Sequence, residues 1–265
     1  MFRKILFPID LSELSRKGLI WTAINVADPS SEITLVHVVE PLSGLDISPM
    51  ISDAETAMEN VEAELAALGI RSRAFVLSGD PLETLSELAH SEGCTISIFF
   101  AESNDIVVPL IRYMAIPHLI VKTKDAQMPP MEPFRHVAVC SDLSPDRTDR
   151  MLGDLKLLLG GSATPMTIIH SVSLDDASSS SEMFQIASSA LEEVRRSVAS
   201  WNPEVQAELI TGEPEVEILR RAEDLKPGIL VVGLSTHGHL WELIIGSTGE
   251  AIIERAPCPV LVIPT

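Results

Sequence analysis

The fold of this protein is decided by a stretch that occurs twice, as Phe2-Arg-Lys-Ile-Leu-Phe-Pro-Ile-Asp10 and as Phe134-Arg-His-Val-Ala-Val-Cys-Ser-Asp142. In each copy a short apolar run ends at an aspartate that Leu-Ser follows. Further along, His37 is matched by His170, and a Gly-acid-Pro triplet also recurs at nearly the same offset. Several landmarks at one offset indicate a tandem duplication of a single domain.

The length agrees with two domains. The chain has 265 residues, about twice the usual size of one domain. A proline-rich segment separates the two copies and is typical of a linker. We therefore predict a first domain over residues 1–123, a linker over 124–133 and a second domain over 134–265.

The composition excludes several classes of partner. The chain carries 38 acidic and 19 basic residues, for a net charge of -19, and a surface of this charge repels nucleic acid and anionic membranes. No apolar run approaches the roughly 20 residues of a membrane span. The three cysteines show no metal-ligand spacing. We expect a cytoplasmic protein with reduced thiols that binds neither nucleic acid nor membrane.

Each half alternates apolar runs with helical patterns, which predicts an α/β fold with a doubly wound parallel sheet. In the second half the expected strands are Val137–Cys140, Met166–His170, Val205–Ile210, Ile229–Val232 and Val260–Ile263. The expected helices are Asp146–Leu159, Glu182–Ser200, Glu215–Leu225 and Thr248–Arg255.

A glycine-containing stretch near the end of the chain is the main candidate for a binding site. The strand that ends near Gly233 leads into a loop, after which Gly246-Ser247-Thr248 opens the last helix. Glycines allow a close approach to the backbone, and the first N–H groups of a helix are unpaired, so this arrangement favours a phosphate. The alternative is an ordinary capping box, because Ser247-Thr-Gly-Glu250 has the Ser-x-x-Glu pattern.

Asp142 has two interpretations as well. It ends the first strand of its half, where it could serve as a turn or helix-capping residue. Ligands of open α/β sheets bind beyond the carboxyl ends of the strands, where the strand order reverses. If the first and fourth strands are neighbours there, Asp142 and Gly233 face the same crevice, and the carboxylate can accept a hydrogen bond from a ligand.

These residues resemble the universal stress protein family, and the chain looks like a tandem member of it. Nucleotide-binding members of that family carry Gly, two residues, Gly, nine residues and then Gly-Ser or Gly-Thr. Here Gly233 is followed by Thr236, where the second glycine is expected, and nine residues later by Gly246-Ser247. The opening Asp-x-Ser and the closing Ala256-Pro-Cys-Pro-Val-Leu-Val-Ile-Pro264 extend the resemblance.

The resemblance implies a five-stranded parallel sheet of order 3-2-1-4-5 with flanking helices in each half. It also implies ATP, ADP or AMP as the ligand, accompanied by Mg²⁺ in the case of ATP. The two halves would pair within the chain as a pseudo-dimer, with a homodimer of whole chains as a further alternative. The implied cofactor-binding residues are Ser141, Asp142, Ser171, Gly233, Thr236, Gly246, Ser247 and Thr248.

The first half departs from this pattern. Its stretch from Ile98 to Pro117 contains no glycine and is about nine residues shorter than its counterpart. We predict that the first half binds no nucleotide and that Asp10 keeps only a capping role.

The function expected from the sequence is that of a regulatory stress-response protein with an unidentified protein partner. The alternatives are a nucleotide-free scaffold with a decayed site, and an enzyme of a related class such as an adenylating ligase. No motif supplies a catalytic residue, so any ATP hydrolysis is expected to be slow. No metal site is predicted, because His237 and His239 have no further ligands at a suitable spacing. The matched His37 and His170 are expected to hydrogen-bond within the fold.

Overall fold

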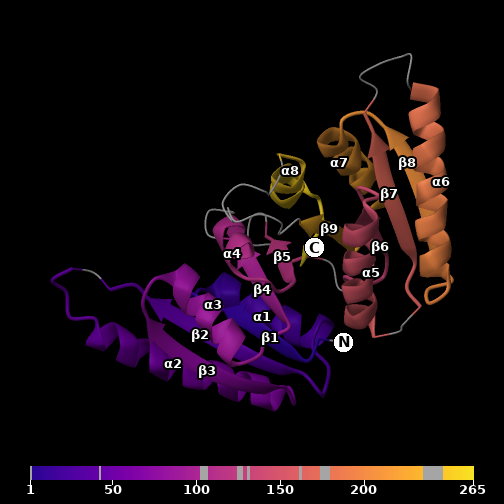
Figure 1. Ribbon diagram of the computed structural model, residues 1–265. Coiled ribbons are helices and arrows are strands. Elements are labelled where there is room, and N and C mark those ends of the chain that lie inside the picture. Colours follow the sequence, from indigo (N-terminus) through magenta and orange to yellow (C-terminus); the bar gives the residue numbers. More distant parts are fainter. Residues whose placement is uncertain are drawn as a thin grey trace. The chain divides into compact units, whose positions relative to one another are not determined.

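The computed structural model describes residues 2–41, 43–101, 107–123, 128–129, 132–160, 163–173, 180–234 and 247–265. The chain divides into two units, Met1–Met131 and Glu132–Thr265. Each unit alternates strands and helices from its beginning to its end (Figure 1). None of the helices in these described ranges is both long and apolar enough to cross a membrane.

The first unit is a parallel sheet in the order β3-β2-β1-β4-β5. Helices α1 and α2 contact each other, as do α3 and α4, so the helices are grouped in two pairs. Its elements are β1 (Lys4–Pro8), α1 (Glu13–Asn25), β2 (Glu32–Val39), α2 (Ser48–Ala67), β3 (Arg71–Ser78), α3 (Pro81–Ser91), β4 (Ile96–Ala101), α4 (Val107–Tyr113) and β5 (His118–Lys122).

The second unit repeats this topology, with the order β10-β9-β6-β7-β8. The α/β doubly wound fold predicted from the repeat is confirmed, and so is the strand order in each half. Its elements are β6 (Val137–Cys140), α5 (Pro145–Leu159), β7 (Met166–Val172), α6 (Ser180–Ala199), β8 (Val205–Thr211), α7 (Pro214–Leu225), β9 (Ile229–Leu234), α8 (Ser247–Arg255) and β10 (Val260–Pro264).

The central strands are apolar because helices cover both faces of the sheet. Ile5 and Leu6 of β1 are fully buried, and so are the residues from Val137 to Val139 of β6. Strand β10 is buried from Val260 to Ile263. This burial holds the carboxyl ends of β6 and β9 side by side, which positions the loops that follow them.

The first helix of each unit begins with a different kind of cap. Ser12 caps α1 with its side chain, which accepts a hydrogen bond from the Ser15 N–H at 3.1 Å. Ser144 precedes α5 without any such side-chain bond, and Pro145 fills the first helical position. The capping role predicted for Asp10 therefore belongs to Ser12, whose own N–H donates to the Asp10 carboxylate at 2.9 Å.

Candidate functional site

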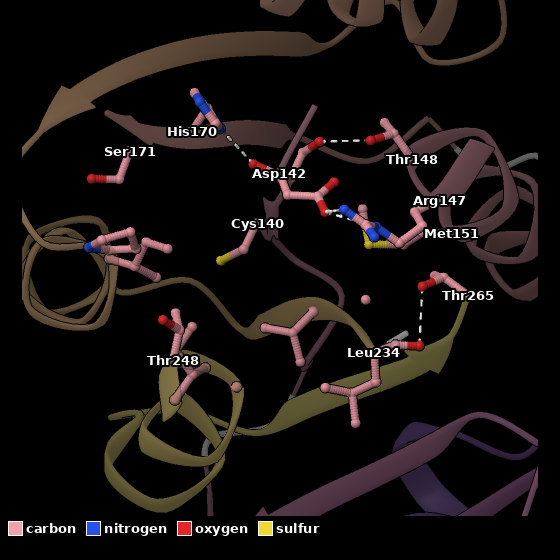
Figure 2. Close-up of a pocket in the computed structure, with 17 residues that line it drawn as sticks. Cys140, Asp142, Arg147, Thr148, Met151, His170, Ser171, Leu234, Thr248 and Thr265 are labelled. Carbon is pink, nitrogen blue, oxygen red and sulfur yellow. Dashed lines mark hydrogen bonds and ion pairs between the residues drawn. The ribbon is translucent and has the colours of Figure 1, made fainter. Parts of the chain in front are cut away.

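A cavity of about 370 Å³ lies in the second unit at the carboxyl ends of β6, β7 and β9 (Figure 2). Strand β6 pairs with β7 on one side and with β9 on the other. The strand order of the sheet therefore reverses at β6. Crevices at such reversal points are the usual binding sites of open α/β sheets. Its volume lies in the range of small-molecule sites.

The turn after β6 forms one wall of the cavity. Leu143 adopts a left-handed backbone conformation with φ of 60°, which a non-glycine residue adopts only when its surroundings hold it there. Ser141 does so, because its Oγ accepts the Leu143 N–H at 3.0 Å and is hydrogen-bonded to the Thr148 hydroxyl at 2.9 Å. The turn is therefore fixed from inside the unit.

Asp142 points its carboxylate along this wall. Its Oδ1 accepts the Ser144 N–H at 2.9 Å, and its Oδ2 accepts a hydrogen bond from Arg147 Nε at 2.8 Å. The turn role considered for Asp142 is thus present, and the carboxylate also lines the cavity. The Arg147 guanidinium forms an ion pair with it, which brings a positive charge to the cavity wall.

The end of β7 contributes a histidine and a serine. His170 Nδ1 donates to the Ser141 carbonyl oxygen at 2.8 Å, and in the first unit His37 Nδ1 donates to the Ile9 carbonyl oxygen at the same distance. This pair of matched bonds confirms the packing role predicted for the two histidines. Ser171 lines the cavity while its Oγ donates to the Gly212 carbonyl oxygen at 2.8 Å.

Gly233 lets Thr265 and Met151 of α5 approach the end of β9 closely. A Cβ atom at this position would lie 3.1 Å from Thr265 Cγ2 and 3.3 Å from Met151 Sδ. Thr265 is held in place because its Oγ1 donates to the Leu234 carbonyl oxygen at 3.0 Å. A larger side chain at Gly233 would enter the space between these neighbours.

Helix α8 forms another part of the cavity wall. Thr248, Gly249 and Ile252 of this helix line it, so the amino-terminal turn of α8 faces the space. The first N–H groups of a helix lack partners within the helix and attract anions. Of the predicted loop residues, Ser247 is the first residue of α8, whereas Thr236 and Gly246 lie outside the described residues.

The cavity offers no activated nucleophile among the described residues. Cys140 lines it at the end of β6, but burial raises the pKa of its thiol far above the usual range. A thiol of this kind stays protonated and unreactive. Within the described part of the chain, no cluster of three or more His, Cys, Asp or Glu residues could hold a metal ion.

The first unit carries an aromatic side chain at the position that matches Gly233, and its ring packs against α1. Phe100 of β4 occupies the position that matches Gly233 of β9. Ile96 pairs with β1 and Ile229 pairs with β6, and Phe100 and Gly233 each lie four residues after these paired positions. The ring of Phe100 packs against Trp21 with centroids 5.6 Å apart and against Phe7 at 5.9 Å. It also lies so close to Gly18 that a Cβ there would be 2.4 Å from Phe100 Cγ.

The segment after that strand also differs between the units. Residues 102–106 separate β4 from α4, whereas residues 235–246 separate β9 from α8. Helix α4 has 7 residues and α8 has 9. These two differences together account for the nine residues by which the first copy is shorter.

Part of the cavity wall comes from residues that the sequence does not point to. Arg147, Thr148 and Met151 of α5 line the cavity, and so does Thr265 beyond β10. Thr148 and Met151 are three residues apart, so they lie on one face of the helix. This spacing predicts that they face the core, but it does not predict a cavity. Nothing in the sequence pairs Thr265 with Leu234, because that contact depends on the register between β10 and β9.

The fold and this crevice define a class, that of tandem doubly wound α/β domains with a ligand-sized cavity at the strand-order reversal. The family model described as the universal stress protein family matches residues 1–96 and 133–264. The chain therefore belongs to the universal stress protein family, of which it is a tandem member.

Known relatives agree with this assignment. A universal stress protein of Methanocaldococcus jannaschii is 34% identical over 74 residues, which are 28% of this chain and 44% of that protein. The chain thus spans less than half the length of this relative. A universal stress protein of Synechocystis is 37% identical over 75 residues, which are 28% of this chain and 69% of that protein.

Solved structures show the same architecture. The crystal structure of a universal stress protein from Archaeoglobus fulgidus aligns with a TM-score of 0.74, and the alignment covers 98% of each chain at 22% identity. The two proteins therefore share the tandem arrangement of two such folds along one chain. At 22% identity this likeness concerns the fold and not the binding site.

Proposed function

We propose that the second unit binds an adenine nucleotide, ATP or a related one, in the cavity at the ends of β6 and β9. The observation that carries the proposal is convergence, because residues far apart in the sequence line the same space, among them Asp142, Ser171, Gly233 and Thr248. Convergent polar groups in a well-formed cavity are the usual mark of a small-molecule site.

The chemistry of the wall suits a nucleotide. Gly233 leaves the strand end without a side chain, so that a ligand can approach the backbone. The amino-terminal turn of α8, with the Thr248 hydroxyl nearby, suits a phosphate, and Asp142 can accept from a ribose hydroxyl or a base amino group. A Mg²⁺ ion would accompany ATP through the phosphate oxygens.

In this proposal the first unit is a nucleotide-free structural partner, because Phe100 places an aromatic ring at the strand position where Gly233 has no side chain. A regulatory role in a cytoplasmic stress response, exercised through a protein partner, belongs to the same proposal and rests on family membership. The intrachain pseudo-dimer also remains a proposal.

Calorimetry with nucleotide-stripped protein tests the binding. We expect one ATP, ADP or AMP per chain. Asp142→Ala should weaken the affinity by about 1–3 kcal/mol, because a hydrogen bond from the ligand to a charged carboxylate is lost. Asp10→Ala, the matched change in the first unit, should leave the affinity unchanged. Two nucleotides per chain, or equal effects of the two variants, would contradict the assignment.

One observation favours a second candidate, a nucleotide-free interaction module. The side chains of Ser141, Asp142 and Ser171 already have hydrogen-bond partners inside the unit. A thermal shift separates the two functions, since a ligand at 100 times its dissociation constant adds about 2.7 kcal/mol of stability. No shift with any adenine nucleotide would leave the interaction module as the better account.

A further inference from the structure

The cavity of the second unit contains an unexpected positive charge. Among the described residues that line it, Asp142 and Arg147 are the ones with a permanent charge. The chain as a whole carries 38 acidic against 19 basic residues, so its general field repels an anionic ligand. A cation in the wall of the cavity therefore matters more here than it would in a neutral protein.

The geometry of the ion pair leaves part of Arg147 available to a ligand. Its Nε donates to Asp142 Oδ2 at 2.8 Å, and its Nη2 pairs with the same oxygen. A guanidinium has five N–H donors in a planar fork, so the edge at Nη1 is not used by this pair. Figure 2 shows the Arg147 side chain reaching from α5 to Asp142 beside Met151.

The pair can also rearrange at low cost. The side chains of Arg147 and Asp142 are 44% and 51% exposed, and ion pairs of this exposure contribute little to stability. If Arg147 turns toward a ligand, Oδ1 of Asp142 keeps its hydrogen bond from the Ser144 N–H. The carboxylate therefore stays in place while the guanidinium moves.

The first unit lacks this cation. Ser15 stands five residues after Asp10, as Arg147 stands five residues after Asp142. There the contact is a hydrogen bond at 3.5 Å from the Asp10 N–H to the Ser15 hydroxyl. Among the described residues, the positive charge beside the aspartate thus occurs in the unit that has Gly233 at the strand end and not in the unit that has Phe100 there.

We propose that Arg147 selects ligands by charge, with its guanidinium binding an anionic phosphate oxygen of the ligand, so that the cavity discriminates nucleotides from uncharged nucleosides. This inference rests on the proposed nucleotide site and adds to it a residue that determines specificity. Asp142 contributes a hydrogen-bond acceptor, and Arg147 offsets the negative charge that this carboxylate would otherwise present to a phosphate.

Calorimetric titrations with AMP, ATP and adenosine test the proposal on the full chain. Arg147→Gln should weaken AMP and ATP binding at least tenfold and change adenosine binding less than twofold. Arg150→Gln removes the same charge from an exposed position of the same helix, and should leave all three affinities within twofold. In Arg147→Gln the salt dependence of AMP binding should also become shallower, because an ionic contact is lost.

The outcomes separate the two levels of the proposal. If Arg147→Gln weakens adenosine as much as AMP, Arg147 acts only by holding Asp142, and charge selection is overturned. If Arg147→Gln binds AMP as well as the unchanged chain, or if Arg150→Gln loses as much, charge selection is overturned too, while the nucleotide site stands. If the unchanged chain binds none of the three ligands, the proposed function fails together with this inference.

Discussion

At the end of the fourth strand, the two units have very different side chains at the same position, an aromatic ring in the first and a glycine in the second. Phe100 of β4 packs into Gly18 of α1, whereas Gly233 of β9 faces Met151 of α5. In one unit the glycine lies on the helix and the bulky group on the strand, and in the other the arrangement is reversed. A duplicated fold can therefore keep its topology while a single strand position changes the packing between the fourth strand and the first helix.

A second difference lies deeper in the sheets. Ser97 pairs with His118 across β4 and β5, and at the same position of the second unit Leu230 pairs with Val260 across β9 and β10. The Ser97 hydroxyl is 2.6 Å from His118 Nδ1, and His118 Nε2 donates to the Met114 carbonyl oxygen at 3.1 Å. The first unit thus buries a polar network where the second buries hydrocarbon.

The largest effect is expected from Gly233→Phe, which transfers the residue of the first unit into the second. The ring would enter the space between Met151 and Thr265 and abolish nucleotide binding in calorimetry. Gly233→Ala should give a smaller loss, because only a Cβ must be accommodated. Gly153→Ala on α5, whose Cβ would meet nothing within 4 Å, is the control and should bind normally. Retained affinity in Gly233→Phe would contradict the site.

The next effect concerns pH. Burial lowers the pKa of His118 from 6.5 to about 4, so between these values the unfolded chain binds a proton that the folded chain does not. His118 costs the folded state nothing above pH 6.5. As the pH drops toward 4, its protonation in the unfolded chain lowers the free energy of unfolding by about 3 kcal/mol. Urea unfolding at pH 7 and pH 4.5 measures this loss.

The double variant Ser97→Leu with His118→Val gives the first unit the apolar pair of the second. We expect it to lose less stability between pH 6.5 and 4 than the unchanged chain. Identical pH profiles for both proteins would show that another group is responsible for the acid sensitivity.

Gly18→Ala should destabilise the first unit by about 1–3 kcal/mol, because its Cβ would collide with the ring of Phe100. Combining it with Phe100→Ala should recover part of the loss in urea unfolding, since alanine lacks the Cγ and Cδ atoms with which the new Cβ would collide. Additive losses in the double variant would mean that the two residues are not in the contact described.

The smallest expected effect is a difference in stability between variants of the two helix caps, Ser12 and Ser144. Ser12→Ala removes a side-chain bond to the Ser15 N–H and should cost about 1 kcal/mol of stability. Ser144→Ala removes no such bond, so its cost in the same urea experiment should be well under half of that. Equal costs would indicate that the caps are equivalent in solution.

Much of the architecture could be predicted because it depends on local patterns of apolar and polar residues. The apolar runs around Val137 and Ile229, and the helical repeats between them, reproduce the observed strands and helices to within one or two residues. The matched histidines were also predictable, since the same residue recurs at the end of the second strand in both copies. Patterns of this kind depend on neighbours in the sequence.

The wall of the cavity was only partly predictable. Asp142, Ser171 and Gly233 follow from the rule that sites lie at the carboxyl ends of strands, and all three line the cavity. Arg147 and Thr265 do not follow from that rule, because their contacts depend on a side-chain direction and on strand register.

The sequence by itself determined that one domain is repeated, that each copy is a parallel α/β sheet and that only the second copy retains a glycine-containing segment after its fourth strand. The tertiary structure alone decided that the ring of Phe100 packs into the groove at Gly18 and that Arg147 stands against Asp142 in the open cavity. The reason is physical. Secondary structure depends on residues a few positions apart, whereas the filling of a cavity depends on which side chains the folded sheet and helices bring within contact distance.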